Sequence, residues 1–341
     1  MSSNKFNVFL AVIALTILVP ANSEAQALIG VRAQGLAGAF VGVADDASAV
    51  YWNPAGLATG AFVSFVLDYG EHDLGPEGGP ASAGGAEHQT GGIVAISAPP
   101  VGIAYYRMTT FGAGPRETVV MGVPGREEVR RSVHALTTST VGVALLQSVG
   151  QYLVVGGTLK LVRGGAAEGS STAILAAEAL DDAAGLVRER HTTGDVDLSA
   201  MSALGHLRLG VVARNLTTPS FALDAGGEAA VELARQVRLG GGWGSGWPGN
   251  SRVVVAVDAD VTRRVAPGGE RRDLAAGTET WWLGQRLGIR GGIRRSTLGE
   301  ARVVVAAGVS GAIRPGMLVE GHVARGQHDE RSWSVGLRFG F

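Results

Sequence analysis

Apolar and polar residues alternate along several segments of this chain. In the segment 252–261, one face carries only valine and alanine, whereas the other includes Arg252, Asp258 and Asp260. The segments 152–163 and 206–214 likewise place leucine and valine opposite polar residues such as Lys160 and Arg208. Because successive side chains of a β-strand point to opposite sides, a period of two predicts strands with one apolar face.

Gly, Pro, Asn and Asp clusters divide the chain into about fourteen such segments. Short connections, such as 98–101 and 149–151, alternate with long ones, such as 164–191 and 215–235. Bacterial outer-membrane barrels have an even number of strands, short periplasmic turns and longer outer loops. We therefore predict a closed antiparallel transmembrane β-barrel, with both termini in the periplasm and with strands at 61–69, 91–98, 101–108, 131–149, 151–163, 192–203, 204–214, 236–244, 251–261, 273–283, 285–294, 301–313, 315–324 and 330–341.

The last segment is the most regular and ends the chain. Trp333, Val335, Leu337, Phe339 and Phe341 share one face, and small or polar residues occupy the other. A terminal alternating strand that closes on an aromatic residue resembles the signal by which outer-membrane barrels are recognised for assembly. The expected partner of this strand is therefore the barrel-assembly machinery, reached through Phe341.

Composition agrees with this class of protein. Glycine accounts for 53 of 341 residues, charged residues for 17%, cysteine is absent and the net charge is −1, which argues against a nucleic-acid binder. Residues 1–27 match a secretory signal peptide, with a short apolar run and a small-residue site at Ala25-Gln26-Ala27. Later segments contain no apolar run of about 18 residues, so helical spans are not expected. The favoured location is the bacterial outer membrane; a soluble sandwich or a secreted solenoid is the alternative.

The segment 28–60 does not alternate. It contains closely spaced glycines, the pair Asp45-Asp46, and the turn sequence Asn53-Pro54-Ala55-Gly56. Small residues allow close backbone approach, and aspartates cap short turns. These features predict a plug folded inside the barrel, so the expected organisation is a signal peptide at 1–27, an N-terminal hatch at 28–60 and a barrel at 61–341.

This segment also carries a family resemblance. The stretches Gly38-Ala39-Phe40 and 45–57 (DDASAVYWNPAGL) resemble the FadL/TodX-type outer-membrane transport proteins, including the related PorV-like barrels. The resemblance implies a 14-stranded barrel with an N-terminal hatch. In the FadL branch, hydrophobic molecules bind near the outer loops and leave through a lateral opening, whereas the PorV branch takes part in protein secretion and surface attachment.

Apolar residues in two long loops are the candidate ligand contacts. They belong to the loops 164–191 and 215–235 and are Ile174, Leu175, Leu180, Phe221 and Leu223. Both loops are short for housing a wide apolar groove, and loop residues of this kind often pack on one another. We therefore keep transport and protein docking as alternatives.

Charged residues on the predicted lumen faces form the second candidate set. We expect an ion network that joins barrel and hatch, made of Arg208, Arg252, Asp258, Asp260, Arg290, Arg302, Glu320 and Arg338. Glu320 and His322 lie two residues apart on one face, but no nucleophile can be assigned to them.

The sequence predicts a non-enzymatic protein that admits hydrophobic small molecules, fatty-acid-like or aromatic, across the outer membrane. The alternative is a PorV-like barrel that docks secreted proteins. No catalytic residue, metal site, cofactor or nucleic-acid partner is expected. The expected surroundings are outer-membrane lipid, and the expected state is a monomer. Arginine at the lipid-facing Val255 should be more harmful than arginine at the lumen-facing Ala256.

Overall fold

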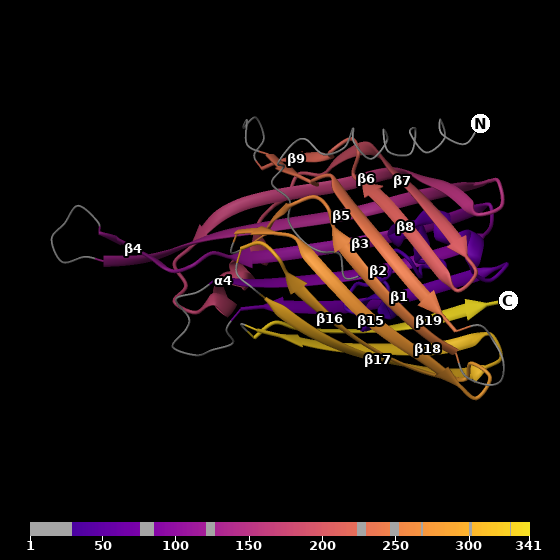
Figure 1. Ribbon diagram of the computed structural model, residues 1–341. Coiled ribbons are helices and arrows are strands. Elements are labelled where there is room, and N and C mark those ends of the chain that lie inside the picture. The colour runs from indigo at the N-terminus through magenta and orange to yellow at the C-terminus, as the bar shows by residue number, and fades with distance from the viewer. Residues whose placement is uncertain are drawn as a thin grey trace.

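The computed structural model describes residues 29–75, 85–120, 127–223, 230–245, 252–266, 269–299, 302–327 and 329–341. The predicted signal peptide and Leu28 lie outside the described residues. Pairing of β3 with β5 closes one large antiparallel sheet into a ring (Figure 1). The sheet contains 15 strands, of which β4 pairs only with the outer end of β5, so 14 strands form the barrel wall.

The wall strands follow one another in chain order around the ring. Their bounds are β1 (Ser64–Leu74), β2 (Ala86–Ala98), β3 (Val101–Ala113), β5 (Glu127–Val149), β6 (Leu153–Ser171), β7 (His191–Leu204), β8 (Leu207–Arg214), β11 (Gln236–Gly244), β12 (Arg252–Asp260), β15 (Asp273–Trp282), β16 (Leu287–Ser296), β17 (Val303–Arg314), β18 (Met317–Gly326) and β19 (Arg331–Gly340).

The other elements are short. Among the described residues, three helices precede the barrel, namely α2 (Val31–Gly35), α3 (Ala49–Trp52) and the 3₁₀-helix η1 (Pro54–Thr59). The outer loops carry β4 (Glu117–Val120), α4 (Ala176–Gly185), β9 (Ser220–Ala222) with β10 (Ala230–Glu232), and β13 (Arg264–Ala266) with β14 (Gly269–Arg271). Within the described residues, none of the helices has the length and apolar character needed to cross a membrane.

The side chains of the wall alternate as predicted. In β12, Val255 and Val257 are 43% and 48% exposed, whereas Val254, Ala256 and Asp258 are buried. In β19, Trp333 and Val335 point outward and Ser334 is buried. A closed barrel with an apolar outer face leaves no unpaired strand edge in lipid. The chain is therefore an outer-membrane β-barrel, as predicted.

The two ends of the barrel differ. Tight turns join β2 to β3, β5 to β6, β7 to β8, β15 to β16 and β17 to β18 at one end, on the right in Figure 1. The elements α4, β4 and β9 lie toward the opposite end. The C-terminus lies at the tight-turn end, where the backbone of Phe341 pairs with Val63. Recognition of Phe341 by assembly machinery stays a prediction.

All fourteen predicted strands are present, but some boundaries differ. β6 continues to Ser171, so the loop predicted at 164–191 is shorter than expected, and Leu204 ends β7 instead of starting β8. Helix α4 covers the outer face of the extended strands, where Ala113 and Val133 are buried against Ala179 and Ala183. Strands covered on both faces lose the alternation on which the sequence prediction depends.

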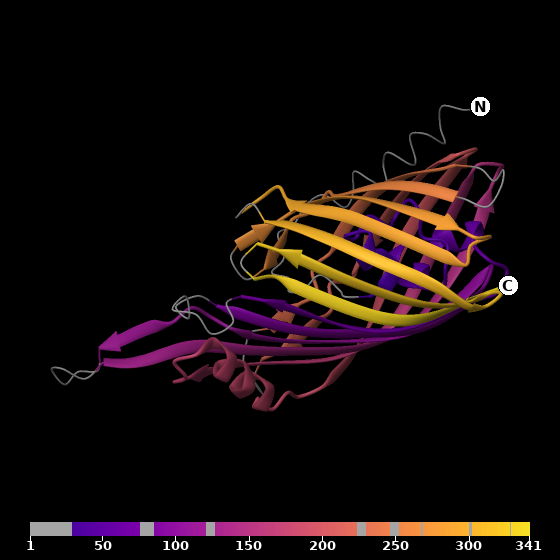
Figure 2. The same cartoon turned by 90° about the horizontal axis from the view of Figure 1, so that it is seen from below.

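The segment 29–60 lies inside the tight-turn half of the barrel (Figure 2). Phe40 and Trp52 are fully buried and pack edge to face, with ring centroids 5.9 Å apart. They share one apolar core with inward residues of the wall such as Ala104 and Ala256. The lumen at this level is therefore a packed core.

Candidate functional site

Carboxylates of the barrel wall bind the backbone of the N-terminal segment. One oxygen of Asp68 (β1) accepts hydrogen bonds from the N–H groups of Gly30 and Val31, at 3.0 and 3.3 Å. One oxygen of Asp258 (β12) accepts from Phe40 and Val41, both at 2.9 Å. These bonds satisfy backbone donors that would otherwise be buried without partners. The segment is thus tied to two sides of the barrel.

The predicted turn Asn53-Pro54-Ala55-Gly56 lies at the start of η1. The Asn53 side chain donates to the Val41 carbonyl at 2.8 Å, which joins two parts of the segment. The Ala55 N–H donates to the hydroxyl of Ser199 on β7 at 3.0 Å. A Cβ at Gly56 would lie 2.1 Å from the Ala44 carbonyl oxygen, so only glycine fits there.

Arg32 is the centre of the ion network between segment and wall. Its guanidinium forms a two-pronged contact with Glu279 of β15, with nitrogen to oxygen distances of 2.7 and 3.0 Å. It also pairs with Asp45 and Asp46. The side chains of Arg32 and Glu279 are 4% and 0% exposed, so this contact has little screening by water.

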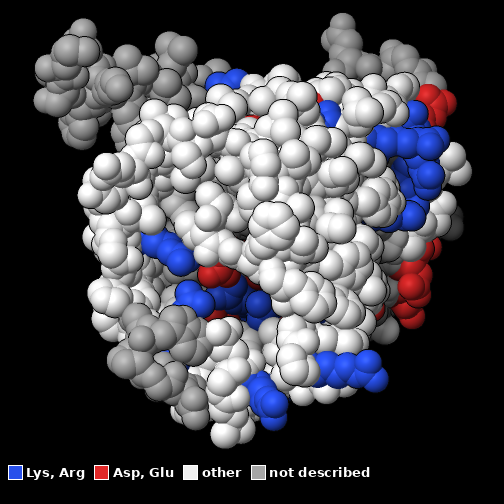
Figure 3. All heavy atoms as spheres, turned by 90° about the vertical axis from the view of Figure 1, so that its right-hand side faces the viewer, with Lys and Arg blue, Asp and Glu red and all other residues white. Residues whose placement is uncertain are grey.

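Asp45 forms ion pairs with two further arginines at the tight-turn end. Arg208 and Arg252 lie 3.4 and 3.6 Å from the carboxylate of Asp45. Burial acts to raise the pKa of Asp45, but Arg32, Arg252 and Arg208 hold this pKa well below its usual range. Asp46 instead accepts hydrogen bonds from the backbone and hydroxyl of Ser48. Figure 3 shows basic and acidic side chains in a hollow at this end.

The remaining predicted network residues form two groups and one outlier. Glu320 of β18 accepts from Arg290 at 3.0 Å and from Arg338 at 3.1 Å. Asp258 and Asp260 lie 3.6 and 3.4 Å from Arg238. Arg302 precedes β17, and its carbonyl accepts from the Ser296 N–H. Arg302 comes two residues before Val304, which packs against Ala37 of the segment.

Three members of the network were not identified from the sequence: Arg32, Glu279 and Arg238. Glu279 is the one charged residue of β15 between Leu274 and Trp282, and it falls on the inward face set by the alternation. That lone charge was the available signal. Arg32 carried no periodic signal, because α2 is only five residues long.

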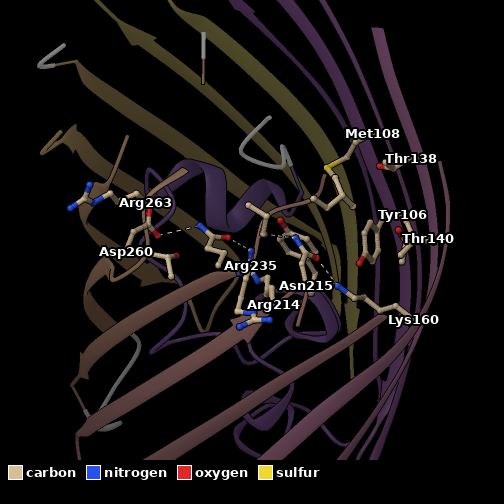
Figure 4. Close-up of a pocket in the computed structure, with 16 residues that line it drawn as sticks. Tyr106, Met108, Thr138, Thr140, Lys160, Arg214, Asn215, Arg235, Asp260 and Arg263 are labelled. Carbon is tan, nitrogen blue, oxygen red and sulfur yellow. Dashed lines mark hydrogen bonds between the residues drawn. The ribbon is translucent and has the colours of Figure 1, made fainter. Parts of the chain in front are cut away.

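A small pocket of about 60 Å³ lies between Tyr51 of the segment and the outer-loop residues Leu233, Ala234 and Arg235 (Figure 4). Tyr51, Tyr106, Met108, Val162 and Leu233 supply apolar surface. The polar lining includes Thr138, Thr140, Lys160, Arg214, Asn215 and Gln236.

The cations of the pocket already have partners. Lys160 lies 2.5 and 2.6 Å from the carboxylates of Asp195 and Asp197 and donates to Asn215 at 2.9 Å. Arg214 stacks on Tyr51, with its guanidinium carbon 4.2 Å from the ring centroid. Lys160 is therefore paired, whereas Arg214 and Arg235 each keep a buried Nε atom that has no hydrogen-bond partner.

The structure separates the predicted loop contacts into two groups. Phe221 is fully buried on the inner wall with Leu136, Val162 and Ala166, and Leu223 packs beside it. Ile174 and Leu175 are 57% and 41% exposed, and Leu180 belongs to α4, which packs on the outer face of the barrel. The loops 164–191 and 215–235 therefore do not form one joint apolar patch.

His322 and Glu320, two residues apart on the inner face of β18, do not form a dyad. His322 contacts the hydroxyls of Ser334 and Ser332, at 2.6 and 3.2 Å, while Glu320 contacts arginines and Ser310. The two side chains thus have separate partners. Across the described residues, no group of three or more His, Cys, Asp or Glu side chains is placed to hold a metal ion.

Glycines of β11 provide a test of the packing between segment and wall. A Cβ at the inward Gly240 would lie 2.6 Å from the Gly42 nitrogen and 2.5 Å from an Asp258 oxygen. At the outward Gly241, its nearest contact would be 3.7 Å away. We expect Gly240→Ala to lower the free energy of unfolding by about 1–3 kcal/mol through overpacking. Gly241→Ala should be neutral or slightly stabilising, and equal effects in denaturant unfolding would contradict the packed lumen.

Comparisons with known proteins support the fold. A family described as "F plasmid transfer operon, TraF, protein" matches residues 128–260, which is less than half of the chain. A sequence search of curated proteins finds no match. Among solved structures, the CymD monoaromatic hydrocarbon channel gives a TM-score of 0.57 at 11% identity, covering 92% of this chain and 97% of that chain.

Two further structures agree. The P. putida toluene transporter TodX has a TM-score of 0.57 at 12% identity, covering 92% of this chain and 98% of its own. A Pseudomonas aeruginosa FadL homologue has a TM-score of 0.55 at 10% identity, covering 96% of this chain and 100% of its own. The resemblance to FadL-type barrels inferred from the sequence is therefore confirmed at the level of the fold.

Proposed function

We propose that this protein admits hydrophobic small molecules across the outer membrane through the barrel lumen. The observation that carries the proposal is an apolar strip inside the barrel. It starts at the outer loop with Phe221 and Leu136, continues through Val162 and Leu233, and reaches Tyr106 and Tyr51 beside the N-terminal segment. Val162 and Leu233 belong both to the loop cluster and to the pocket, so the buried loop cluster directly adjoins the pocket.

The solved structures most similar in fold include proteins named as channels for monoaromatic hydrocarbon or toluene, and one named as a FadL homologue. The names of the first two describe a channel and a transporter. An apolar lumen surface in the same fold fits substrates of similar character, such as single aromatic rings or alkyl chains.

The segment 28–60 is the proposed hatch of this route. The ladders between neighbouring wall strands are continuous among the described residues, apart from a register shift between Ala312 and Arg314. Within the described part of the chain, the closed wall offers no side exit, and the strip ends against Tyr51 and Trp52 of the segment. Passage beyond this point requires the segment to move or the wall to open.

Interrupting the strip tests the proposal. Leu233→Gln places an amide in both the loop cluster and the pocket, so the initial rate of labelled toluene uptake should fall by about tenfold, the effect of losing one buried leucine contact. Leu180→Gln is the matched control, because Leu180 is also a partly buried loop leucine but packs on the outer face. Uptake should be compared at equal surface levels. Equal rates for both variants would contradict the lumen route.

Protein docking is the second candidate function. Apolar side chains near α4 are exposed on the outer face, with Val187 at 90% and Ile174 at 57%. A PorV-like role would make these residues contacts for an exported protein. In that case, replacing Ile174 and Val187 with serine would impair surface attachment of other proteins, while Leu233→Gln would leave it unchanged.

A further inference from the structure

A cluster of arginines lies on the outward face of β3 and β6, at the loop end. The strand register places Arg107 of β3 opposite Ser139 of β5, and Ser139 opposite Arg163 of β6. All three residues occupy outward positions of the wall. Two strand spacings separate the arginine backbones by about 10 Å, so both guanidiniums can reach one multivalent anion.

The chain that follows α4 adds two more arginines. Arg188 lies over the ring of Phe111, an outward residue of β3, at 5.5 Å from the ring centroid. Burial and the positive charges of Arg190 and Arg107 lower the pKa of Arg188. The positive charges of Arg107, Arg188 and Arg190 therefore repel one another here and are not fully balanced by carboxylates. In the part of the chain that the structure describes, neither Arg107 nor Arg163 has an ion pair.

A groove in the outer wall lies directly below Arg107. It has a volume of about 470 Å³, and its lining includes Leu67, Tyr69, Gly92, Val94, Tyr105 and Arg107. Gly92 lies between Tyr69 and Arg107 in the register and has no side chain, so the wall is hollowed between two tyrosines and an arginine. The groove faces lipid. Its apolar lining comes from outward residues of three neighbouring strands, β1, β2 and β3.

The position of Arg107 relative to the membrane suggests what kind of group it binds. Below Arg107, the outward positions of β3 are Val101, Ile103 and Tyr105, all exposed. Arg107 is thus the first charge above the apolar band. Arginine on a lipid-facing wall costs up to about 2–4 kcal/mol near the midplane and less near the interface, and a phosphate offers it short, charge-assisted hydrogen bonds.

We infer that this surface binds one phosphorylated lipid of the outer leaflet, with its phosphates on Arg107 and Arg163 and an acyl chain in the groove between Tyr69 and Tyr105. The arginines supply charge complementarity, and the groove supplies the apolar contact that a free anion would not use. Arg188 and Arg190 extend the positive surface toward the sugar or phosphate groups farther from the membrane. The inference does not depend on what passes through the lumen.

The test uses the full-length barrel in nanodiscs and compares two double variants. Arg107→Gln/Arg163→Gln removes the cluster, while Arg295→Gln/Arg325→Gln removes two other exposed, outward arginines at the same end of β16 and β18. Retention of bisphosphorylated lipid A is measured by native mass spectrometry after mild delipidation. The measurement is repeated with dephosphorylated lipid A in place of lipid A, and with inorganic phosphate added as a competitor.

Wild type and the β16/β18 variant should retain one lipid A, and the Arg107/Arg163 variant should retain about tenfold less, as expected for losing charge-assisted hydrogen bonds. Dephosphorylated lipid A should be lost from all three proteins, and inorganic phosphate should not displace the lipid at millimolar concentration. Equal losses in the two double variants would show a general charge effect and overturn the site. Displacement by inorganic phosphate would show a free-anion site and overturn the lipid.

Discussion

Replacing Arg32 with alanine should lower the free energy of unfolding by about 3–5 kcal/mol, the cost of leaving a buried partner charge uncompensated. Glu279 is fully buried and accepts two hydrogen bonds from Arg32. Arg290 lies 3.4 Å from Glu279 but also pairs with Glu320, so it does not replace Arg32. The measurement is denaturant unfolding of the folded barrel in lipid.

Two controls make this result specific. Arg263→Ala removes an arginine whose pair with Glu270 is exposed, at 64% and 46%, so it should cost less than about 1 kcal/mol. Arg32→Met combined with Glu279→Met removes both charges and should cost less than Arg32→Ala alone. If Arg32→Ala matched the exposed control, the contact between segment and wall would not be formed in the membrane.

Arginine at Val255 should cost about 2–4 kcal/mol, because this side chain faces the middle of the lipid layer. Val255 is 43% exposed on the outer face of β12 and is followed there by Val257. Val255→Leu is the matched control and should be close to neutral. A small effect of Val255→Arg on unfolding in lipid would contradict the assigned outer face.

The sequence also predicted that arginine at Ala256 would be less harmful than arginine at Val255, and the structure argues against this. Ala256 is 1% exposed and belongs to the core shared with Phe40 and Trp52. The sequence pattern showed correctly that Ala256 faces the lumen, and a plug inside the barrel was also predicted, but local spacing did not show that the plug packs directly against this position. Because the N-terminal segment fills this level, Ala256→Arg should be at least as harmful as Val255→Arg.

The fold could be predicted from the sequence because each wall strand meets lipid on one side. This boundary makes apolar and polar side chains alternate with a period of two. Tight turns at 98–101, 149–153 and 314–317 show that successive strands run up and down. The predicted strand 101–108 stopped short of the loop end of β3, where α4 covers the outer face and the burial of Ala113 removes the contrast.

The site was predicted less completely because its contacts join residues far apart in the chain. Arg32 and Glu279 are 247 residues apart, and nothing in local spacing relates them. Lumen orientation of Arg208, Arg252 and Glu320 followed from alternation, but their partners depend on how the segment folds. Phe221 and Leu180 looked alike as loop residues, yet one lies on the inner wall and the other on the outer face.

Locking the hatch tests the central claim, passage of hydrophobic molecules through the lumen, most directly. The chain has no cysteine, and a Cβ at Gly242 would lie 2.3 Å from a methyl group of Val43. Val43→Cys with Gly242→Cys therefore places two sulfurs within disulfide reach. Uptake of labelled toluene and of a long-chain fatty acid is measured in cells before and after reduction.

The proposed route predicts uptake above a barrel-free control for wild type, loss of that uptake in the oxidised double-cysteine protein, and recovery on reduction. Each single-cysteine variant should show the same uptake under oxidising and reducing conditions, because it cannot form the disulfide. Uptake that is equal in the oxidised and reduced forms would contradict a route controlled by the segment. Wild-type uptake no greater than that of the barrel-free control would contradict transport itself.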